Sequence, residues 1–294
     1  MNHSTLKFNT ILVAADLSTD SSAALKYAQA IARLHGSTLV LVHVIDPLGY
    51  AFPHGTPSSL DADHAARNEL ARIEEEIQAQ GIPVRSIVES GLVCERILQA
   101  VEDHHADLLV LGTRVRSKAG RVALGTIARQ LLAKAPCPIL AVSADTDTVL
   151  PWAGRWRRVL AATDFSPASL TALNLAQRMT HSHLLALHAS SNGTGNCSHC
   201  LERLRFLAPF NESHTVPVEH IVTAGNSAEV IATYAQKFHA DLVVLGSPKN
   251  ELSEEDMQTS TVLQVISRVS CPVLCVPQAA LTPSIELIEE IAQC

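Results

Sequence analysis

Short apolar runs alternate with amphipathic segments along the chain. In the first half the apolar runs lie at 11–16, 38–46, 84–88, 108–111 and 139–142. Between them, segments with apolar residues at helical spacing predict helices at 21–34, 63–79, 94–104 and 126–135. Short, fully apolar strands that alternate with helices are typical of a parallel sheet covered on both faces. The pattern therefore predicts an α/β fold.

The second half of the chain repeats the first. The matching pairs of segments are ILVAADLS (11–18) with VLAATDFS (159–166), 91–113 with 225–247, and CPILAV (137–142) with CPVLCV (271–276). A repeat of this length is a whole domain rather than a small structural unit. We therefore predict two tandem, doubly wound, Rossmann-like domains, each with a parallel five-stranded sheet.

The expected boundaries follow from this repeat. They give an N-terminal domain at 1–146, a C-terminal domain at 147–280 and a helical tail at 281–294. The first copy is longer, and a Pro/Gly/Ser-rich loop at 47–61 accounts for most of the excess. We expect the tail to pack on a neighbouring domain or subunit.

Composition excludes several classes of protein. The hydrophobic fraction of 47% suits well-packed cores, and a net charge of −7 argues against general nucleic-acid binding. Neither a signal peptide nor an apolar run of roughly 20 residues, the length of a membrane span, is visible. The seven cysteines are an odd number and are expected to be reduced thiols. These features predict a cytoplasmic protein without a membrane partner.

The segment from Leu108 to Thr126 carries the strongest chemical signal. Its apolar strand runs into Gly112, a loop at 113–124 with four cations and no carboxylate follows, and Gly125-Thr126 opens a predicted helix. A helix N-terminus offers unpaired N–H groups and the positive end of a dipole, and glycine lets an anion approach the backbone. The segment therefore predicts a phosphate-binding site.

The matching loop of the second half has the opposite charge. Residues 247–258 hold one lysine and four carboxylates, which sum to −3, against +4 for the loop at 113–124. Like charges at close range repel, so the second loop should reject a phosphate that the first attracts.

These landmarks resemble the universal stress protein family in its tandem form. The resemblance is carried in each half by an Asp and a Ser at the end of strand one, by Ala-Asp before a strand that ends in VLG, and by a late Cys-Pro strand. It implies doubly wound sheets with strand order 3-2-1-4-5, and pairing of the two halves through their last strands. It also implies that two such chains pair again, as a homodimer.

Members of this family that bind ATP show a loop of the form G-x2-G-x9-G-(S/T). Gly112, Gly125 and Thr126 fit this pattern, whereas Val115 departs from it. In the second half only two positions fit the pattern, and Lys249 and Thr259 replace glycines. The residues that fit there are Gly246 and Ser260.

The resemblance implies an ATP site in the N-terminal domain. In an open parallel sheet the ligand lies beyond the carboxyl ends of the strands, where the strand order reverses, so Asp16 and Gly112 should face one crevice. ATP or another adenine nucleotide, alone or with Mg²⁺, would be a regulatory ligand, with at most slow, incidental hydrolysis. The expected contacts are Ala15, Asp16 and Val44 at the adenosine end, and Gly112, Arg114, Val115, Gly125 and Thr126 at the phosphates.

Two other functions stay open. One is a dimerising interaction module in which neither half binds a nucleotide. The other is a metal or redox sensor built on the CxxC of Cys197 and Cys200 with His199. No catalytic signature is visible in the sequence.

Several chemically suggestive residues are expected to be structural. Asp107 and Asp241 precede strands, Asp164 suits a turn or cap, and Cys271 and Cys275 belong to the core. The histidine pairs at 104–105 and at 181 and 183 are interpreted as surface residues near helix ends.

Overall fold

The fold was analysed in a computed structural model of the chain. It describes residues 7–17, 21–46, 59–116, 122–143, 146, 156–190, 198–209, 216–247 and 260–278, without the side chains of 59–62, 114–116, 122, 123 and 198. The expected tail at 281–294 lies outside the described residues.

The N-terminal half alternates strands and helices, as the apolar pattern predicts. Its elements are β1 (Thr10–Ala14), α1 (Ser22–His35), β2 (Thr38–Ile45), α2 (Ser59–Gln78), β3 (Val84–Ser90), α3 (Val93–Asp103), β4 (Leu108–Gly112), β5 (Arg114–Arg116), β6 (Val122–Leu124), α4 (Thr126–Lys134) and β7 (Ile139–Val142).

The C-terminal half repeats this order. Its elements are β8 (Trp156–Ala162), α5 (Pro167–Met179), β9 (Thr180–Ser190), α6 (Ser198–Leu207), β10 (Val218–Ala224), α7 (Ser227–Phe238), β11 (Leu242–Ser247), α9 (Thr261–Arg268) and β12 (Val273–Pro277).

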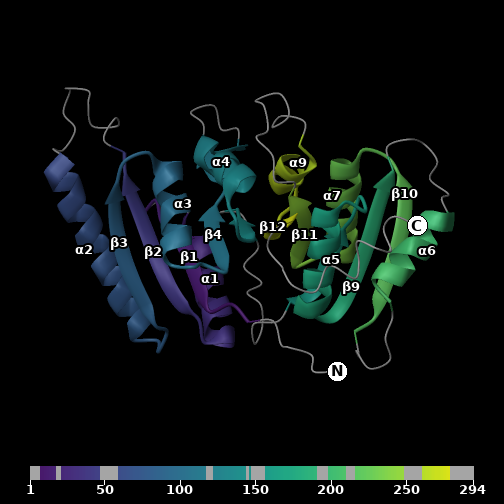
Figure 1. Cartoon of the computed structure of the whole chain (residues 1–294), viewed down its shortest axis with the longest axis horizontal. Coiled ribbons are helices and arrows are strands. Elements are labelled where there is room, and N and C mark those ends of the chain that lie inside the picture. Colours follow the sequence, from purple (N-terminus) through teal and green to yellow (C-terminus); the bar gives the residue numbers. More distant parts are fainter. Residues whose placement is uncertain are drawn as a thin grey trace.

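The two halves form one continuous ten-stranded sheet (Figure 1). The order within each half is 3-2-1-4-5, as β3-β2-β1-β4-β7 and as β10-β9-β8-β11-β12. The last strands, β7 and β12, pair antiparallel, with Leu140 opposite Leu274. The expected pairing of the halves through their last strands is therefore confirmed. Helices α1, α2, α5 and α6 cover one face of the sheet, and α3, α4, α7 and α9 cover the other.

The structure corrects two details of the sequence interpretation. Helix α2 begins at Ser59, inside the expected loop and ahead of the predicted start at residue 63. The cationic loop contains a short hairpin, because β5 and β6 pair antiparallel. His181 and His183 are exposed at the start of β9, two and four residues after α5 ends at Met179 (181 − 179 and 183 − 179), so their expected place on the surface near a helix end is confirmed.

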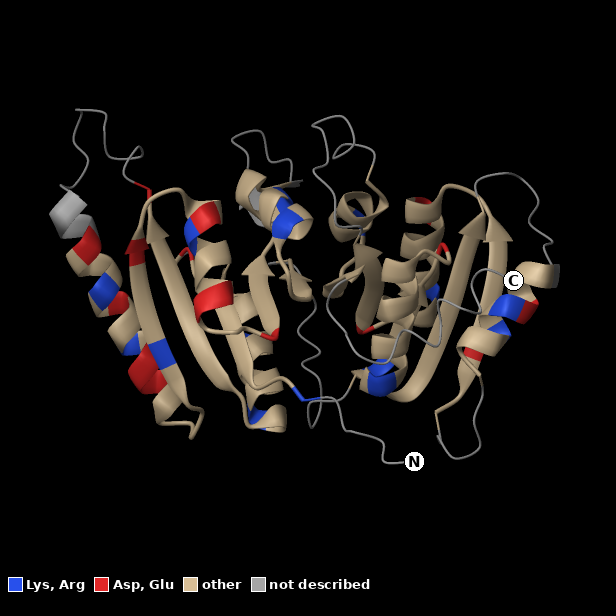
Figure 2. Ribbon diagram, viewed as in Figure 1, with Lys and Arg blue, Asp and Glu red and all other residues tan. Residues whose placement is uncertain are grey.

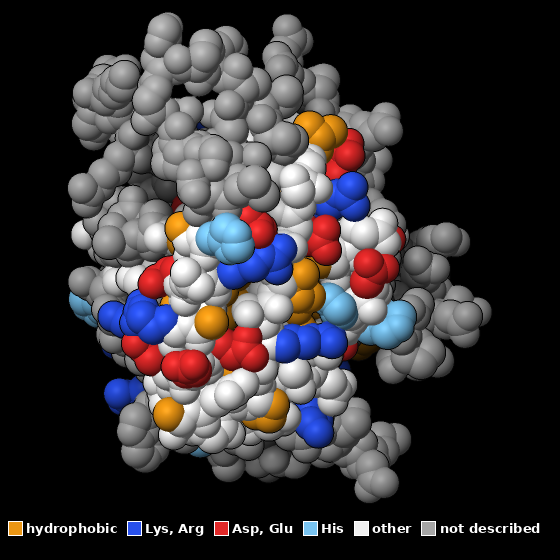
Figure 3. Space-filling model, turned by 90° about the vertical axis from the view of Figure 1, so that its left-hand side faces the viewer, with side chains coloured by type: hydrophobic (Ala, Val, Ile, Leu, Met, Phe, Trp, Pro, Cys, Tyr) orange, Lys and Arg blue, Asp and Glu red, His pale blue; other side chains and the backbone are white. Residues whose placement is uncertain are grey.

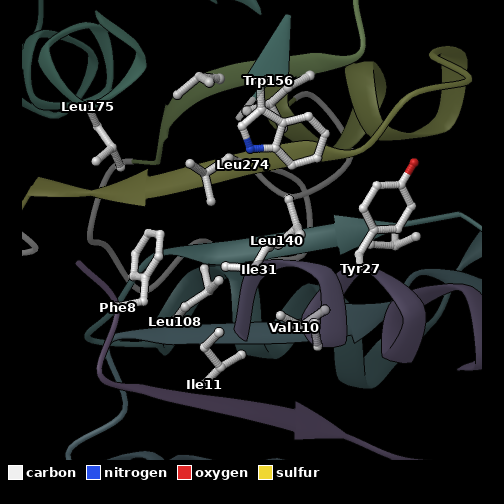
Figure 4. Packing of buried hydrophobic residues seen from close by; sticks show 14 of the residues in the cluster. Phe8, Ile11, Tyr27, Ile31, Leu108, Val110, Leu140, Trp156, Leu175 and Leu274 are labelled. Atoms are coloured by element: carbon white, nitrogen blue, oxygen red, sulfur yellow. The ribbon is translucent and has the colours of Figure 1, made fainter. Parts of the chain in front are cut away.

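An aromatic stack joins the two halves. The rings of Tyr27 on α1 and Trp156 on β8 are nearly parallel, with their centroids 5.9 Å apart. These side chains are 0% and 1% exposed. Figure 4 shows them beside Leu140 and Leu274, which come from the two paired strands. The halves therefore share one dry core, to which buried aromatic rings contribute a large apolar area.

A matching aspartate ties the start of the central strand in each half. Asp107 Oδ2 accepts hydrogen bonds from the backbone N–H groups of Asn9 (2.6 Å) and Thr10 (3.0 Å). The Asp241 carboxylate accepts bonds from the N–H groups of Arg157 and Arg158, both at 3.0 Å. Burial raises the pKa of Asp241, and these N–H donors oppose the rise. The structural role expected for both residues is confirmed.

Charge lies on the helices and strand ends, and most of the sheet is uncharged (Figure 2). Over α2, cations and carboxylates alternate with scattered apolar side chains (Figure 3). Arg67 pairs with Asp63 at 2.8 Å, and Arg72 pairs with Glu69 at 2.6 Å. This face is therefore a mixed, solvated surface rather than a basic one. Among the described helices, none has the length and apolar character needed to cross a membrane.

Replacing either aspartate by alanine should destabilise the fold by about 1–3 kcal/mol, because two backbone donors lose their acceptor. Urea denaturation of Asp107→Ala and Asp241→Ala would measure the loss. Glu102→Ala, at an exposed position on α3, is the control and should change little. Equal stability of all three variants would contradict the structural role.

Candidate functional site

The strands β1 and β4 of the N-terminal half end at one edge of the sheet. These strands are parallel neighbours, with Ala14 opposite Leu111, so Asp16 and Gly112 follow at the same edge of the sheet. The Ala15 N–H donates to the Val42 carbonyl at 2.9 Å, which ties this end of strand one to β2. Asp16 is exposed, and Val44 is half-buried on β2. The topology therefore puts Asp16 and Gly112 at a common edge, as predicted.

A histidine holds the carbonyl next to Asp16. His43 Nδ1–H donates to the Ala15 carbonyl oxygen at 2.8 Å. The C-terminal half repeats this bond, from His188 to the Thr163 carbonyl, also at 2.8 Å. Sequence reasoning missed both residues, although a histidine at the same place in the second strand of each half was a usable signal. Because both halves share the bond, it belongs to the fold rather than to one ligand.

The cationic segment follows β4 and forms a hairpin. Arg114 pairs with Leu124, and Val115 pairs with Ala123. The Gly125 N–H donates to the carbonyl of Thr113 at 3.4 Å, which closes the base of the hairpin. Val115 therefore lies in a strand, a conformation that β-branched residues favour, and its position needs no glycine.

Helix α4 starts with its backbone donors available. Its N-cap is Gly125, with extended backbone (φ −62°, ψ 149°), and its first turn holds no acidic residue. Among the described residues no side chain caps this helix start, and Thr126 is exposed. The first N–H groups of a helix have no partner within the helix and attract anions. This end of the hairpin is therefore suited to an anionic group.

The C-terminal half differs at the same place. Helix α5 begins at Pro167, five residues after β8 ends at Ala162 (167 − 162), whereas α1 begins eight residues after β1 ends (22 − 14). A Cβ added at Gly246 would lie only 2.4 Å from the backbone nitrogen of Ser169. The first turn of α5 therefore rests directly on the end of β11. Gly246 is needed for this packing, whether or not a ligand binds.

Hydrogen bonds within the chain occupy the polar groups around the start of α5. Thr163 Oγ1 and Ser169 Oγ are 2.8 Å apart, and Asp164 Oδ1 accepts from the N–H of Ser166 at 3.0 Å. Partial burial alone would raise the pKa of Asp164, but hydrogen bonds from Ser166 and Ser169 outweigh it and hold the pKa below its usual value. Asp164 is therefore a turn residue, as expected.

Side chains also stack beside this turn. The rings of Phe165 and His188 have centroids 4.5 Å apart. The Arg203 guanidinium lies 4.7 Å from the Phe165 ring centre. A cation over an aromatic face is a stabilising arrangement. Phe165, which follows β8, is thus contacted by side chains from β9 and α6.

The thiols give little support to a metal or redox centre. Burial raises the pKa of Cys137, Cys271 and Cys275 to about 12, so these thiols are protonated at neutral pH. Cys275 lies in the core, as expected, and Cys271 is half-buried. Cys197 is outside the described residues, whereas His199 and Cys200 lie on α6. Within the described part of the chain, no three His, Cys, Asp or Glu residues are grouped to hold a metal.

Gly246→Ala should destabilise the protein by about 1–3 kcal/mol, because the new methyl group meets backbone atoms that cannot turn away. Thermal unfolding would measure the change. Hydrogen exchange should show faster exchange at the start of α5, at Ser169. An unchanged melting temperature would mean that α5 does not rest on this glycine.

Comparison with known proteins agrees with the repeat. A sequence model described as the universal stress protein family matches residues 7–143 and 201–277, well over half of the chain. A universal stress protein of Thermus aquaticus is 35% identical over 144 residues, which cover 46% of this chain and 98% of that protein. One from Methanocaldococcus jannaschii is 24% identical over 153 residues, which cover 46% of this chain and 94% of that protein.

Solved structures match the whole chain in fold. A universal stress protein from Archaeoglobus fulgidus has a TM-score of 0.73 at 23% identity, covering 92% of this chain and 96% of that one. A functionally unknown protein from Pseudomonas aeruginosa PAO1 has a TM-score of 0.61 at 21% identity, covering 97% of each chain. With the family match over both halves, the conclusion is direct: this chain belongs to the universal stress protein family and carries two family-like halves in tandem.

Proposed function

We propose that this protein binds ATP, or another adenine nucleotide, in its N-terminal half as a regulatory ligand. The observation that carries the proposal is the hairpin in the cationic loop. It follows β4, which pairs with β1, the strand that precedes Asp16, and it leads into Gly125 and the start of α4. The backbone donors at the start of α4 and the Asp16 carboxylate thus follow two neighbouring strands, and the segment between β4 and α4 carries four cations. Such a set suits a ligand with phosphates at one end and polar hydrogen-bonding groups at the other.

Each part of the nucleotide has its own residues in this proposal. The α4 N–H groups, Gly112, Gly125 and Thr126 hold the phosphates, with Arg114 and Val115 on the hairpin beside them. Ala15 and Val44 border the adenosine, and Asp16 accepts a hydrogen bond from a ribose hydroxyl or from the adenine amino group. Mg²⁺ would accompany the phosphates and offset their charge.

The C-terminal half is proposed not to bind this ligand. Its loop holds four carboxylates against one lysine, and the first turn of α5 packs against Gly246, near the end of β11. Both features act against a triphosphate, one through repulsion and the other through bulk. A binding ratio of one nucleotide per chain is therefore expected.

A relative supports the class of ligand without fixing its details. A universal stress protein from Archaeoglobus fulgidus has been solved in complex with dAMP. That protein matches only 46% of this chain, with a TM-score of 0.36, so it says nothing about which half binds or how many phosphates are preferred.

Calorimetry tests the proposal. The wild-type protein, titrated with ATP and Mg²⁺, should bind one ATP per chain. Gly125→Val should weaken binding at least about tenfold, a loss of roughly 1.4 kcal/mol, because a branched side chain crowds the phosphates. The matched control is Thr259→Val at the equivalent position of the C-terminal half, which should leave the affinity unchanged.

Absence of heat and of any melting shift at millimolar ATP would reject nucleotide binding. The interaction module would then be favoured, and its pairing of whole chains can be measured by light scattering of the wild-type protein.

A further inference from the structure

The hairpin of the N-terminal half rests on the C-terminal half. Strand β6, which leads directly into Gly125, lies against α9. Leu124 at the end of β6 is half-buried and packs onto the same hydrophobic cluster as the buried α9 residues Val262, Val265 and Ile266. Leu263 is half-buried on this helix and packs onto the cluster too. The strand that leads to the start of α4 therefore lies against a helix from the other half.

A second link joins the far end of α4 to the C-terminal half. The Ser247 hydroxyl, at the end of β11, donates to the carbonyl oxygen of Leu132 at 3.2 Å. The equivalent hydroxyl in the N-terminal half, that of Thr113, donates within its own half to the Val142 carbonyl at 3.3 Å. The two halves therefore use one position differently: the Ser247 hydroxyl reaches across to the other half, whereas the Thr113 hydroxyl stays within its own. Ser247 is buried, so water competes little for this bond.

Helix α9 has little freedom of its own. It packs against α7 and β11 within its half. The sheet beneath it is continuous with that of the N-terminal half through β7 and β12. Helix α9 is therefore fixed within its own half and also lies against β6 of the other half.

We propose that the C-terminal half positions the nucleotide segment of the N-terminal half, with Leu263 and Ser247 as positioning residues. This inference rests on the proposed function and names what controls that site. Residues 122–132 are held at one end by α9 and at the other by Ser247. The start of α4 between them keeps its N–H groups aligned for phosphates only while both supports hold. The C-terminal half thus has a role even though its own loop is acidic.

The test compares two half-buried apolar residues of the C-terminal half. Leu263→Ala removes packing on the α9 side of the cluster, whereas the control Val230→Ala removes packing from α7, which lies against α9, β8 and β9. Hydrogen–deuterium exchange of the full-length variants, without nucleotide, should show faster exchange at Gly125 and in 122–128 for Leu263→Ala alone. Calorimetry should show ATP binding weakened about fivefold, a loss of roughly 1 kcal/mol, with adenosine binding unchanged.

Unchanged exchange in 122–128 for Leu263→Ala would overturn the inference, as would an equal effect of Val230→Ala. Ser247→Ala is the second variant, because it removes one hydroxyl without opening the core. It should speed exchange in the last turn of α4 and weaken ATP binding, and a wild-type pattern for it would count against the inference. If the wild-type protein binds no ATP, the proposed function fails, and the exchange experiment still decides whether the C-terminal half supports the hairpin.

Discussion

The antiparallel pairing of β7 and β12 is the constraint on which the rest of this structure depends. Each half alone would end in a strand with unpaired backbone groups, a surface that invites pairing with other chains. Pairing the two last strands satisfies these groups and aligns Leu140 with Leu274 on one face of the sheet. The stack of Tyr27 on Trp156 then seals the same face. The carboxyl ends of β1 and β4, and those of β8 and β11, consequently belong to one continuous sheet.

Gly112 and Gly246 occupy equivalent positions in the two halves, but the local structure around them differs. Gly246 gives the first turn of α5 room to touch the end of β11. In the N-terminal half, α1 begins later relative to its strand, and Gly112 leads into a cationic hairpin. The glycine signature alone therefore does not separate a phosphate site from a packing contact. What separates them is the start of the following helix and the charge of the loop.

Much of the fold could be predicted because its signals are periodic or repeated. Fully apolar runs such as that of β4 mark buried parallel strands, and the parallel topology then requires Asp16 and Gly112 to share an edge. The hairpin escaped prediction because strands of three residues, such as Arg114–Arg116, are too short to show a period. The role of Gly246 depends on contact with a distant segment, the first turn of α5. Such contacts leave no local pattern in a single sequence.

Fusion of the halves explains how one of them can support the other. In a symmetric dimer of identical chains, any residue that supports the partner's site also occurs beside its own site, so both sites change together. Here Ser247 and Thr113 occupy equivalent positions but donate to different acceptors, one across the join and one within its half. In the proposed arrangement one half binds the ligand and the other half supports its site. The loop of the supporting half then does not need a charge that suits a phosphate.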